Sequence, residues 1–268
     1  MRLANWTTGA DEQVIVAPIN GGTSNYSNNL GGIGIDVEHN SGLLNFVVTE
    51  TTANGNQHGL RLSSDGVGTL LVADVVDNFG FNNNSGDGIR LVSVGGSTQR
   101  VQLVQPAGIS GNGQSGVNLL AGSDTLGGAS TIEFFTMDTT FTQNGVGMRA
   151  ISTGDGQILA NFSDVTFTLN QIHADIAAQN NSIAQVNRFV FDDVTMDNTF
   201  GLLGGGGDAI RISNSGTSLL DVVVTNSVIT TSNSDFNPPG GGGTPLADTQ
   251  AGFGEGQAFD LDLSLIHI

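Results

Sequence analysis

The sequence predicts an all-β fold in which short parallel strands stack into a solenoid. Glycine supplies 40 of the 268 residues, 38% of the residues are hydrophobic and only 12% are charged. This composition is typical of β proteins that are rich in turns. Glycine interrupts every long segment in which the 3.6-residue period of an amphipathic helix could run, so the sequence argues against helices.

An internal repeat is the second observation. A glycine, an apolar residue, a variable residue and a second apolar residue recur from Gly32, Gly59, Gly88, Gly116 and Gly147, and in weaker form from His173 and Asp208. The period is about 28 residues, with one insertion, when these first apolar residues are aligned: Ile33, Leu60, Ile89, Val117, Met148, Ala174 and Ile210.

Each repeat contains further runs with strand character. The second run covers residues 43–48, 70–76, 101–104, 132–135, 158–162, 186–191 and 220–224. A third run follows an acidic or amide residue at 138–141, 164–167, 193–196 and 226–229. A unit this small cannot bury its own apolar face, so the units must stack and their equivalent strands must pair in parallel. Propeller blades need longer repeats of four antiparallel strands, which excludes that fold.

The best copy of the repeat runs from Phe134 to Ile151 and contains Asp138, Phe141 and Asn144. Its pattern, a strand, Asp or Asn, x-x-Phe, then x-Asn-Gly-x-Gly-Ile-x-Leu, resembles the right-handed parallel β-helix of the pectin-lyase-like superfamily over roughly residues 30–235. The resemblance implies a right-handed parallel β-helix solenoid of about seven coils. We expect an irregular lead-in or incomplete first coil over 1–29, the β-helix over 30–237 and a glycine-rich extension over 238–268.

The superfamily contains lyases, hydrolases, adhesins and phage tailspikes, so the fold alone does not imply an activity. In composition the chain is similar to acidic, lysine-poor, cysteine-free surface repeat proteins and autotransporter passengers of bacteria. That similarity implies an extracellular or cell-surface location. The run Leu263–Ile268 resembles translated sequencing-adapter read-through, in which case the chain is a fragment of a larger parent polypeptide. The alternative is a final strand over 259–265.

Charge narrows the range of partners. Lys and Arg number 7 against 25 Asp and Glu, for a net charge of -18, and every one of the 7 cations is an arginine. Nucleic acid and anionic membranes are therefore poor partners. The sequence has no cysteine and hence no disulfide, and no run approaches the roughly 18 apolar residues that membrane insertion needs.

Arginine recurs at one position of the first strand. Side chains alternate between the two faces of a strand, so the residue between the two apolar positions points to solvent. The predicted outward column is Gly34, Arg61, Arg90, Asn118, Arg149, Asp175 and Arg211. Enzymes of the superfamily bind polysaccharide along this face, so Arg61, Arg90, Arg149, Asp175 and Arg211 are candidates for binding an anionic glycan. The alternative is that each arginine pairs with nearby acids.

The same face offers little for catalysis. A glycoside hydrolase needs two carboxylates roughly 5 to 10 Å apart, whereas Asp36 and Asp175 lie on the first and sixth coils, about 24 Å apart at the spacing of strands. A superfamily lyase uses an arginine beside several Asp-bound Ca²⁺ ions, and only Asp175 is near Arg149 and Arg211. We therefore expect a non-catalytic structural or adhesive module. The alternative is a polysaccharide-binding or polysaccharide-degrading domain, a lyase or hydrolase, acting on anionic glycan.

Acidic and amide residues precede the third run in successive repeats. They are Asp74, Gln105, Asp138, Asp164, Asp193 and Asn226. Three stacked aspartates, Asp138, Asp164 and Asp193, would repel one another unless each caps its own turn or they share a cation such as Ca²⁺. The sequence predicts no other cofactor, and its four histidines lack the spacing of metal ligands.

Overall fold

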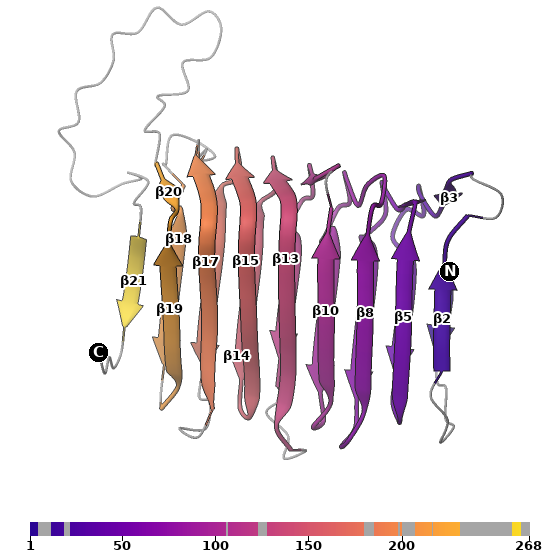
Figure 1. Cartoon of the computed structure of the whole chain (residues 1–268), viewed down its shortest axis with the longest axis horizontal. Coiled ribbons are helices and arrows are strands. Elements are labelled where there is room, and N and C mark those ends of the chain that lie inside the picture. The colour runs from indigo at the N-terminus through magenta and orange to yellow at the C-terminus, as the bar shows by residue number, and fades with distance from the viewer. Residues whose placement is uncertain are drawn as a thin grey trace, which may run out of the picture.

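The chain forms a right-handed parallel β-solenoid of about 7 turns over residues 13–229, with roughly 29 residues per turn. The computed structural model describes residues 1–4, 12–18, 22–105, 107–122, 128–179, 185–197, 199, 207–215, 217–230 and 259–263. Figure 1 shows the strands side by side along the long axis, from β2 at one end to β21 at the other. The predicted fold class is confirmed. The glycine-rich stretch 238–256 and the last five residues lie outside the described residues.

The first sheet has nine strands, and every described pairing is parallel. In spatial order they are β1 (Arg2–Ala4), β4 (Ile33–His39), β7 (His58–Asp65), β9 (Ile89–Val94), β12 (Ser115–Ala121), β14 (Val146–Thr153), β16 (Ile172–Gln179), β18 (Ile210–Ser215) and β21 (Phe259–Leu263). The sheet follows chain order, because each coil adds one strand beside its predecessor.

The second sheet has ten strands. Eight form a parallel path: β2 (Glu12–Val16), β5 (Leu43–Thr49), β8 (Leu70–Val76), β10 (Thr98–Val104), β13 (Ser130–Thr142), β15 (Gly156–Thr168), β17 (Val186–Asp197) and β19 (Leu219–Thr225). The short strands β11 (Ile109–Ser110) and β20 (Val228–Ile229) pair with β13 and β17, and β3 (Ser24–Asn25) pairs with β6 (Thr51–Thr52). The predicted second and third runs are one strand in β13, β15 and β17.

The core lies between the two sheets and is built from columns of equivalent side chains. Apolar residues on both sides of the outward column are at most 1% exposed in successive first strands: Ile89, Leu91, Val117, Leu119, Met148 and Ile176. Phenylalanines stack between coils, with ring centroids 4.9 Å apart for Phe162 and Phe191 and 5.0 Å for Phe141 and Phe167. Apolar burial across every coil stabilises the stack.

A buried ladder of asparagines runs along one turn of the solenoid. Its members, each at most 2% exposed, are Asn56, Asn84, Asn112, Asn144 and Asn170. Asn29 begins the series and Asn170 ends it: each backbone N–H from Asn29 to Asn144 donates to the side-chain oxygen of the asparagine in the next coil, at 2.8 to 3.1 Å. The ladder satisfies turn amides that would otherwise be buried without a partner.

Gly59, Gly88, Gly116 and Gly147 line the core beside this ladder, where an added Cβ would clash with the next coil. A Cβ on Gly116 would lie 2.7 Å from the carbonyl oxygen of Gly147 and 2.7 Å from the ring of Phe141. In the sixth coil His173 takes the place of the glycine, since its neighbours Ile172 and Ala174 pair in register with Val146 and Met148. The His173 imidazole is fully buried, and burial lowers its pKa to about 4.

Two predicted alignments were wrong. Leu60 pairs in register with Ile35, not with Ile33, because two additional residues separate the ladder asparagine from the strand in the first coil. The outward column therefore contains Asp36 where Gly34 was expected. In the acidic turn column, Asp77 takes the place predicted for Asp74, which instead lies within β8 and pairs with Gln102.

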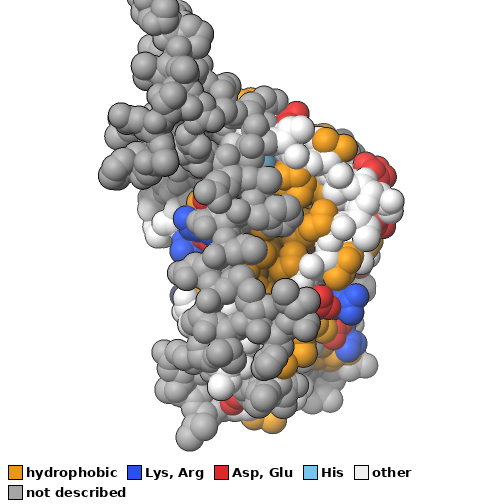
Figure 2. All heavy atoms as spheres, turned by 90° about the vertical axis from the view of Figure 1, so that its left-hand side faces the viewer, with side chains coloured by type: hydrophobic (Ala, Val, Ile, Leu, Met, Phe, Trp, Pro, Cys, Tyr) orange, Lys and Arg blue, Asp and Glu red, His pale blue; other side chains and the backbone are white. Residues whose placement is uncertain are grey.

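At the β21 end, among the described residues, the second sheet has no strand beside β19 to match β21 of the first sheet. On β19 the inward-facing side chains of Val222 and Val224 are only partly buried, whereas their counterparts Phe189 and Phe191 on β17 are at most 1% exposed. Figure 2 shows apolar side chains gathered at this end. The described residues contain no helix long and apolar enough to cross a membrane.

Candidate functional site

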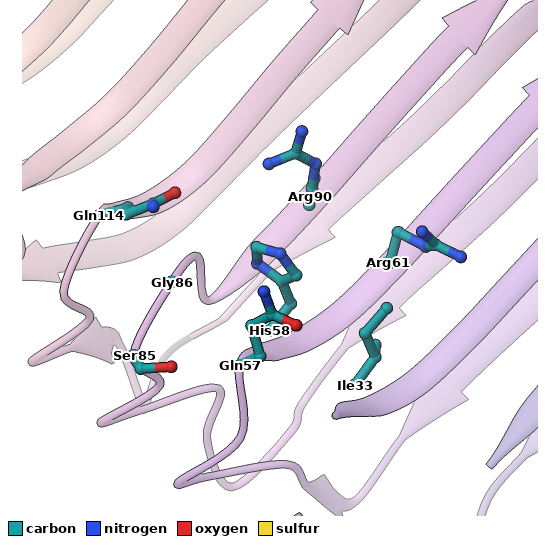
Figure 3. A pocket seen from close by; sticks show the side chains of 8 residues that line it. All are labelled: Ile33, Gln57, His58, Arg61, Ser85, Gly86, Arg90 and Gln114. Carbon is teal, nitrogen blue, oxygen red and sulfur yellow. The ribbon is translucent and has the colours of Figure 1, made fainter. Parts of the chain in front are cut away.

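A polar hollow of about 430 Å³ opens on the first sheet where β7 and β9 begin. We call it the His58 hollow, and its lining residues are Ile33, Gln57, His58, Arg61, Ser85, Gly86, Arg90 and Gln114. Figure 3 shows the His58 ring beside Arg61 and Arg90, with Gln57, Ser85 and Gln114 on the side of the turns. Its volume is within the range of small-ligand sites, although its lining is more polar than most.

Register and a glycine place the central imidazole. His58 and Asp87 each directly precede a glycine at the start of the first strand of a coil. They lie at equivalent places in adjacent coils, because Leu60 pairs in register with Ile89. The turn that contains Gly86 packs directly on the ring, where an added Cβ would lie 2.8 Å from the imidazole Cε1. The hollow therefore depends on the absence of a side chain at Gly86.

The hydrogen bonding of His58 determines its tautomer. The backbone N–H of Asp87 donates to Nδ1 at 3.0 Å, so the neutral ring carries its proton on Nε2. Burial lowers the pKa of His58; the Asp87 carboxylate raises it, and the Arg90 and Arg61 charges lower it further. At neutral pH His58 is thus an uncharged donor through Nε2, which has no hydrogen-bond partner among the described residues.

Asp87 is the buried anion beneath the hollow, and its side chain is 0% exposed. It accepts hydrogen bonds from the Ser115 N–H at 3.2 Å, from Arg90 Nη1 at 3.2 Å and from Asn118 Nδ2 at 3.0 Å. The contact through Nη1 is the single ion pair of Arg90 within the described residues. The remaining guanidinium donors of Arg90 are therefore available to a ligand.

Arg61 is held more tightly than Arg90. Its Nε and Nη2 donate to the two oxygens of Asp36 at 2.7 and 2.9 Å, and Nη2 also donates to Glu38 at 2.5 Å. Arg2 donates to Glu38 at 2.9 Å, and this hydrogen bond is the main cause that lowers the pKa of Glu38. The charges of the two carboxylates and the two guanidinium groups thus cancel at the N-terminal end of the outward column.

The geometry favours ligand binding over acid–base catalysis. The lone pair of His58 Nδ1 is occupied by a backbone N–H and Nε2 is protonated, so the neutral ring lacks a free basic nitrogen. The Ser85 hydroxyl donates to the carbonyl oxygen of Asn56 at 3.4 Å instead of to His58. Donors dominate the hollow, and such a site suits a ligand that presents acceptor oxygens.

The other predicted glycan-binding residues form a separate cluster on the same column. Arg211 donates to Asp175 through Nε at 3.0 Å and Nη2 at 2.7 Å, and Arg149 approaches the same carboxylate at 3.6 Å. Arg149 lies two strands beyond Arg90. The structure thus brings Arg61 and Arg90 together at the hollow and Arg149, Asp175 and Arg211 together further along the sheet.

The three candidate calcium ligands occupy equivalent turns on the other sheet. Asp138, Asp164 and Asp193 are exposed, lie in register in successive coils and have left-handed backbones with φ of 48°, 53° and 55°. Asp and Asn tolerate this conformation better than most residues. In the described part of the chain there is no group of three or more His, Cys, Asp or Glu side chains placed to hold a metal ion. A shared Ca²⁺ stays a prediction.

Sequence reasoning missed His58, Asp87 and the amides at the rim of the hollow. The available signal was positional, because His58 and Asp87 both directly precede the first-strand glycine in consecutive repeats. Adjacent coils place such residues side by side at about 4.8 Å.

Comparison of the chain with protein-family models, curated protein sequences and solved structures gave no match.

Proposed function

We propose that the chain is a non-catalytic, adhesive β-solenoid module that binds an anionic glycan at the His58 hollow. The observation that carries the proposal is the convergence of the His58 Nε2–H donor with the open guanidinium donors of Arg90. Carboxylate or sulfate groups of an acidic sugar present the acceptors that these donors need. The cluster of Arg149, Asp175 and Arg211 lies on the same column, and we expect a longer glycan chain to reach it.

The rest of the fold supports a structural role. Ladders of buried asparagines and stacked phenylalanines bind each coil to the next, which suits a rigid module that carries a binding surface. The solenoid and its repeat pattern favour a place among pectin-lyase-like β-helices of the bacterial surface type. An extracellular or cell-surface location is part of the proposal.

Affinity electrophoresis in gels containing polygalacturonate tests the binding. We expect retardation that weakens with salt, because the contacts are electrostatic. Gln114→Glu places a negative charge at the exposed rim of the hollow and should weaken binding about tenfold, roughly 1.4 kcal/mol. Gln102→Glu makes the same charge change on the second sheet and should leave binding intact. Equal retardation of both variants, or none of the parent, would contradict the proposal.

The non-catalytic part has its own test. Incubation with pectate, alginate or neutral glucans should release neither reducing ends nor unsaturated ends. The reason is the tautomer of His58 and the engagement of Asp36 and Asp175 in ion pairs with arginines. Product release that disappears in Asp175→Ala or Arg149→Ala would overturn this part and favour the lyase or hydrolase alternative.

A further inference from the structure

A second recess, of about 360 Å³, lies on the outer face of the second sheet, around Phe135 on β13. We call it the Phe135 groove. Phe135 points away from the core, since its neighbours Phe134 and Thr136 are the buried residues of this strand. Phe135 itself is only partly buried, and Leu159 and Val72 border the groove on nearby strands. The groove thus has an aromatic and aliphatic floor open to solvent.

Polar side chains flank this ring on both neighbouring strands. Gln102 on β10 and Asn161 on β15 pair in register with Phe135, one on each side, and Asp74 lies one strand beyond Gln102. All three are exposed, and their side chains make no hydrogen bond within the described residues. At strand spacing, the two amide residues therefore lie about 4.8 Å from Phe135 along the solenoid axis, and Asp74 lies about 9.6 Å from it.

The charges in the groove disfavour an anion. Arg100 is the single cation in the lining, and its Nε donates to Glu133 at 2.8 Å. Asp74 adds a carboxylate that has no cationic partner in the described part of the chain. The net charge of the groove is thus negative, in contrast to the donor-rich His58 hollow.

We propose that the Phe135 groove binds a neutral glycan, a ribbon of β-linked hexopyranose units that lies across the strands. A pyranose ring has an apolar C–H face that can pack on the flat aromatic ring, while its hydroxyls hydrogen-bond in the ring plane. Gln102 and Asn161 stand where hydroxyls on either side of the stacked sugar can donate and accept. A flat ribbon matches the outer face of a regular sheet, whereas a helical glycan meets only part of it.

Isothermal titration with cellohexaose tests the groove, with maltohexaose as the helical comparison. The parent should bind cellohexaose, and Phe135→Ala should weaken binding at least tenfold while Phe135→Tyr, which keeps the ring, retains it. Phe79→Ala removes another aromatic ring, 57% exposed in a turn, and should change nothing. Far-UV circular dichroism confirms that each variant is folded, which is expected because Phe135 points outward.

This inference is independent of the proposed function, because it concerns the other sheet and an uncharged ligand. Gln114→Glu, which weakens polygalacturonate binding, should leave the cellohexaose affinity unchanged, and Phe135→Ala should leave polygalacturonate binding unchanged. Absence of cellohexaose binding by the parent, equal affinity for maltohexaose, or full affinity in Phe135→Ala would each overturn the proposal.

Discussion

Removal of one rung of the asparagine ladder should strongly destabilise the solenoid. Asn144 is 0% exposed, and its side-chain oxygen accepts from the backbone N–H and the Nδ2 of Asn112 at 3.1 and 2.9 Å. Its Nδ2 donates to the carbonyl oxygen of Ile109 at 3.0 Å and to Asn170 at 3.1 Å. Asn144→Ala removes all four contacts and leaves the buried backbone N–H and Nδ2 of Asn112 without their acceptor.

The magnitude follows from these lost contacts. Each contributes about 1 kcal/mol, and an orphaned buried group costs about 1 to 3 kcal/mol, so Asn144→Ala should lower the free energy of unfolding by about 3 to 5 kcal/mol. For a chain of this size the Tm should fall by roughly 6 to 20 °C. Urea unfolding followed by circular dichroism measures the first quantity and calorimetry the second.

Asn161→Ala is the matched control, because this asparagine is exposed and its side chain makes no hydrogen bond in the described part of the chain. It should change the free energy of unfolding by at most about 0.5 kcal/mol. Hydrogen exchange adds a local readout, since the Asn112 amide loses its acceptor only in Asn144→Ala. Equal stability of the two variants, with the Asn112 amide still protected, would refute the ladder as a source of stability.

Three further outcomes follow from single positions. Gly116→Ala should lower the free energy of unfolding, measured in urea, by about 2 kcal/mol or more, since its Cβ would meet backbone and ring atoms at 2.7 Å. Gly22→Ala, which has open space around it, should leave the free energy of unfolding unchanged. Asp164→Asn should raise the free energy of unfolding by about 0.5 to 1 kcal/mol, by relief of repulsion between stacked carboxylates. If the three aspartates share a Ca²⁺ ion, the Tm of the parent is higher in CaCl2 than in NaCl of the same ionic strength, whereas the Tm of this variant is the same in both salts. Equal Tm values of the parent in the two salts exclude a shared Ca²⁺. The pKa of His173 is lowered from 6.5 to about 4. As pH falls from 6.5 to 4, His173 is therefore protonated in the unfolded chain but not in the folded chain, and the free energy of unfolding decreases. This decrease in the free energy of unfolding, of up to about 3 kcal/mol, should be absent in His173→Gln. Parallel profiles of the free energy of unfolding against pH for parent and variant would contradict this prediction.

The solenoid could be predicted because its repeat is written directly in the sequence. A glycine between the turn and the first strand recurs from Gly59 to Gly147, and the structure shows why, since a Cβ on Gly88 would lie 2.7 Å from the next glycine's carbonyl oxygen. The alternation around Leu60 and Leu62 gave the inward face, and both are 0% exposed. Steric and burial constraints of this kind act on every coil, so they leave a periodic signal.

The site could be predicted only in part because its geometry depends on exact register. Alignment on the glycines shifted the first coil by two residues, since Ile35 lies six positions after Asn29 whereas Leu60 lies four positions after Asn56. That shift concealed the pairing of Asp36 with Arg61. The contact between His58 and Asp87 runs through a backbone N–H, and no residue pattern reports such a bond.

The most direct test of the proposed binding site uses the arginine side chains as reporters. The chain has 7 arginines and no lysine, so each Nε–H gives an assignable NMR signal. Titration with trigalacturonate should shift the signal of Arg90 most, that of Arg61 less, and those of Arg100 and Arg188 on the second sheet not at all. Shifts confined to Arg100 and Arg188, or no shift at saturating ligand, would contradict the assignment of the His58 hollow as the anionic glycan site.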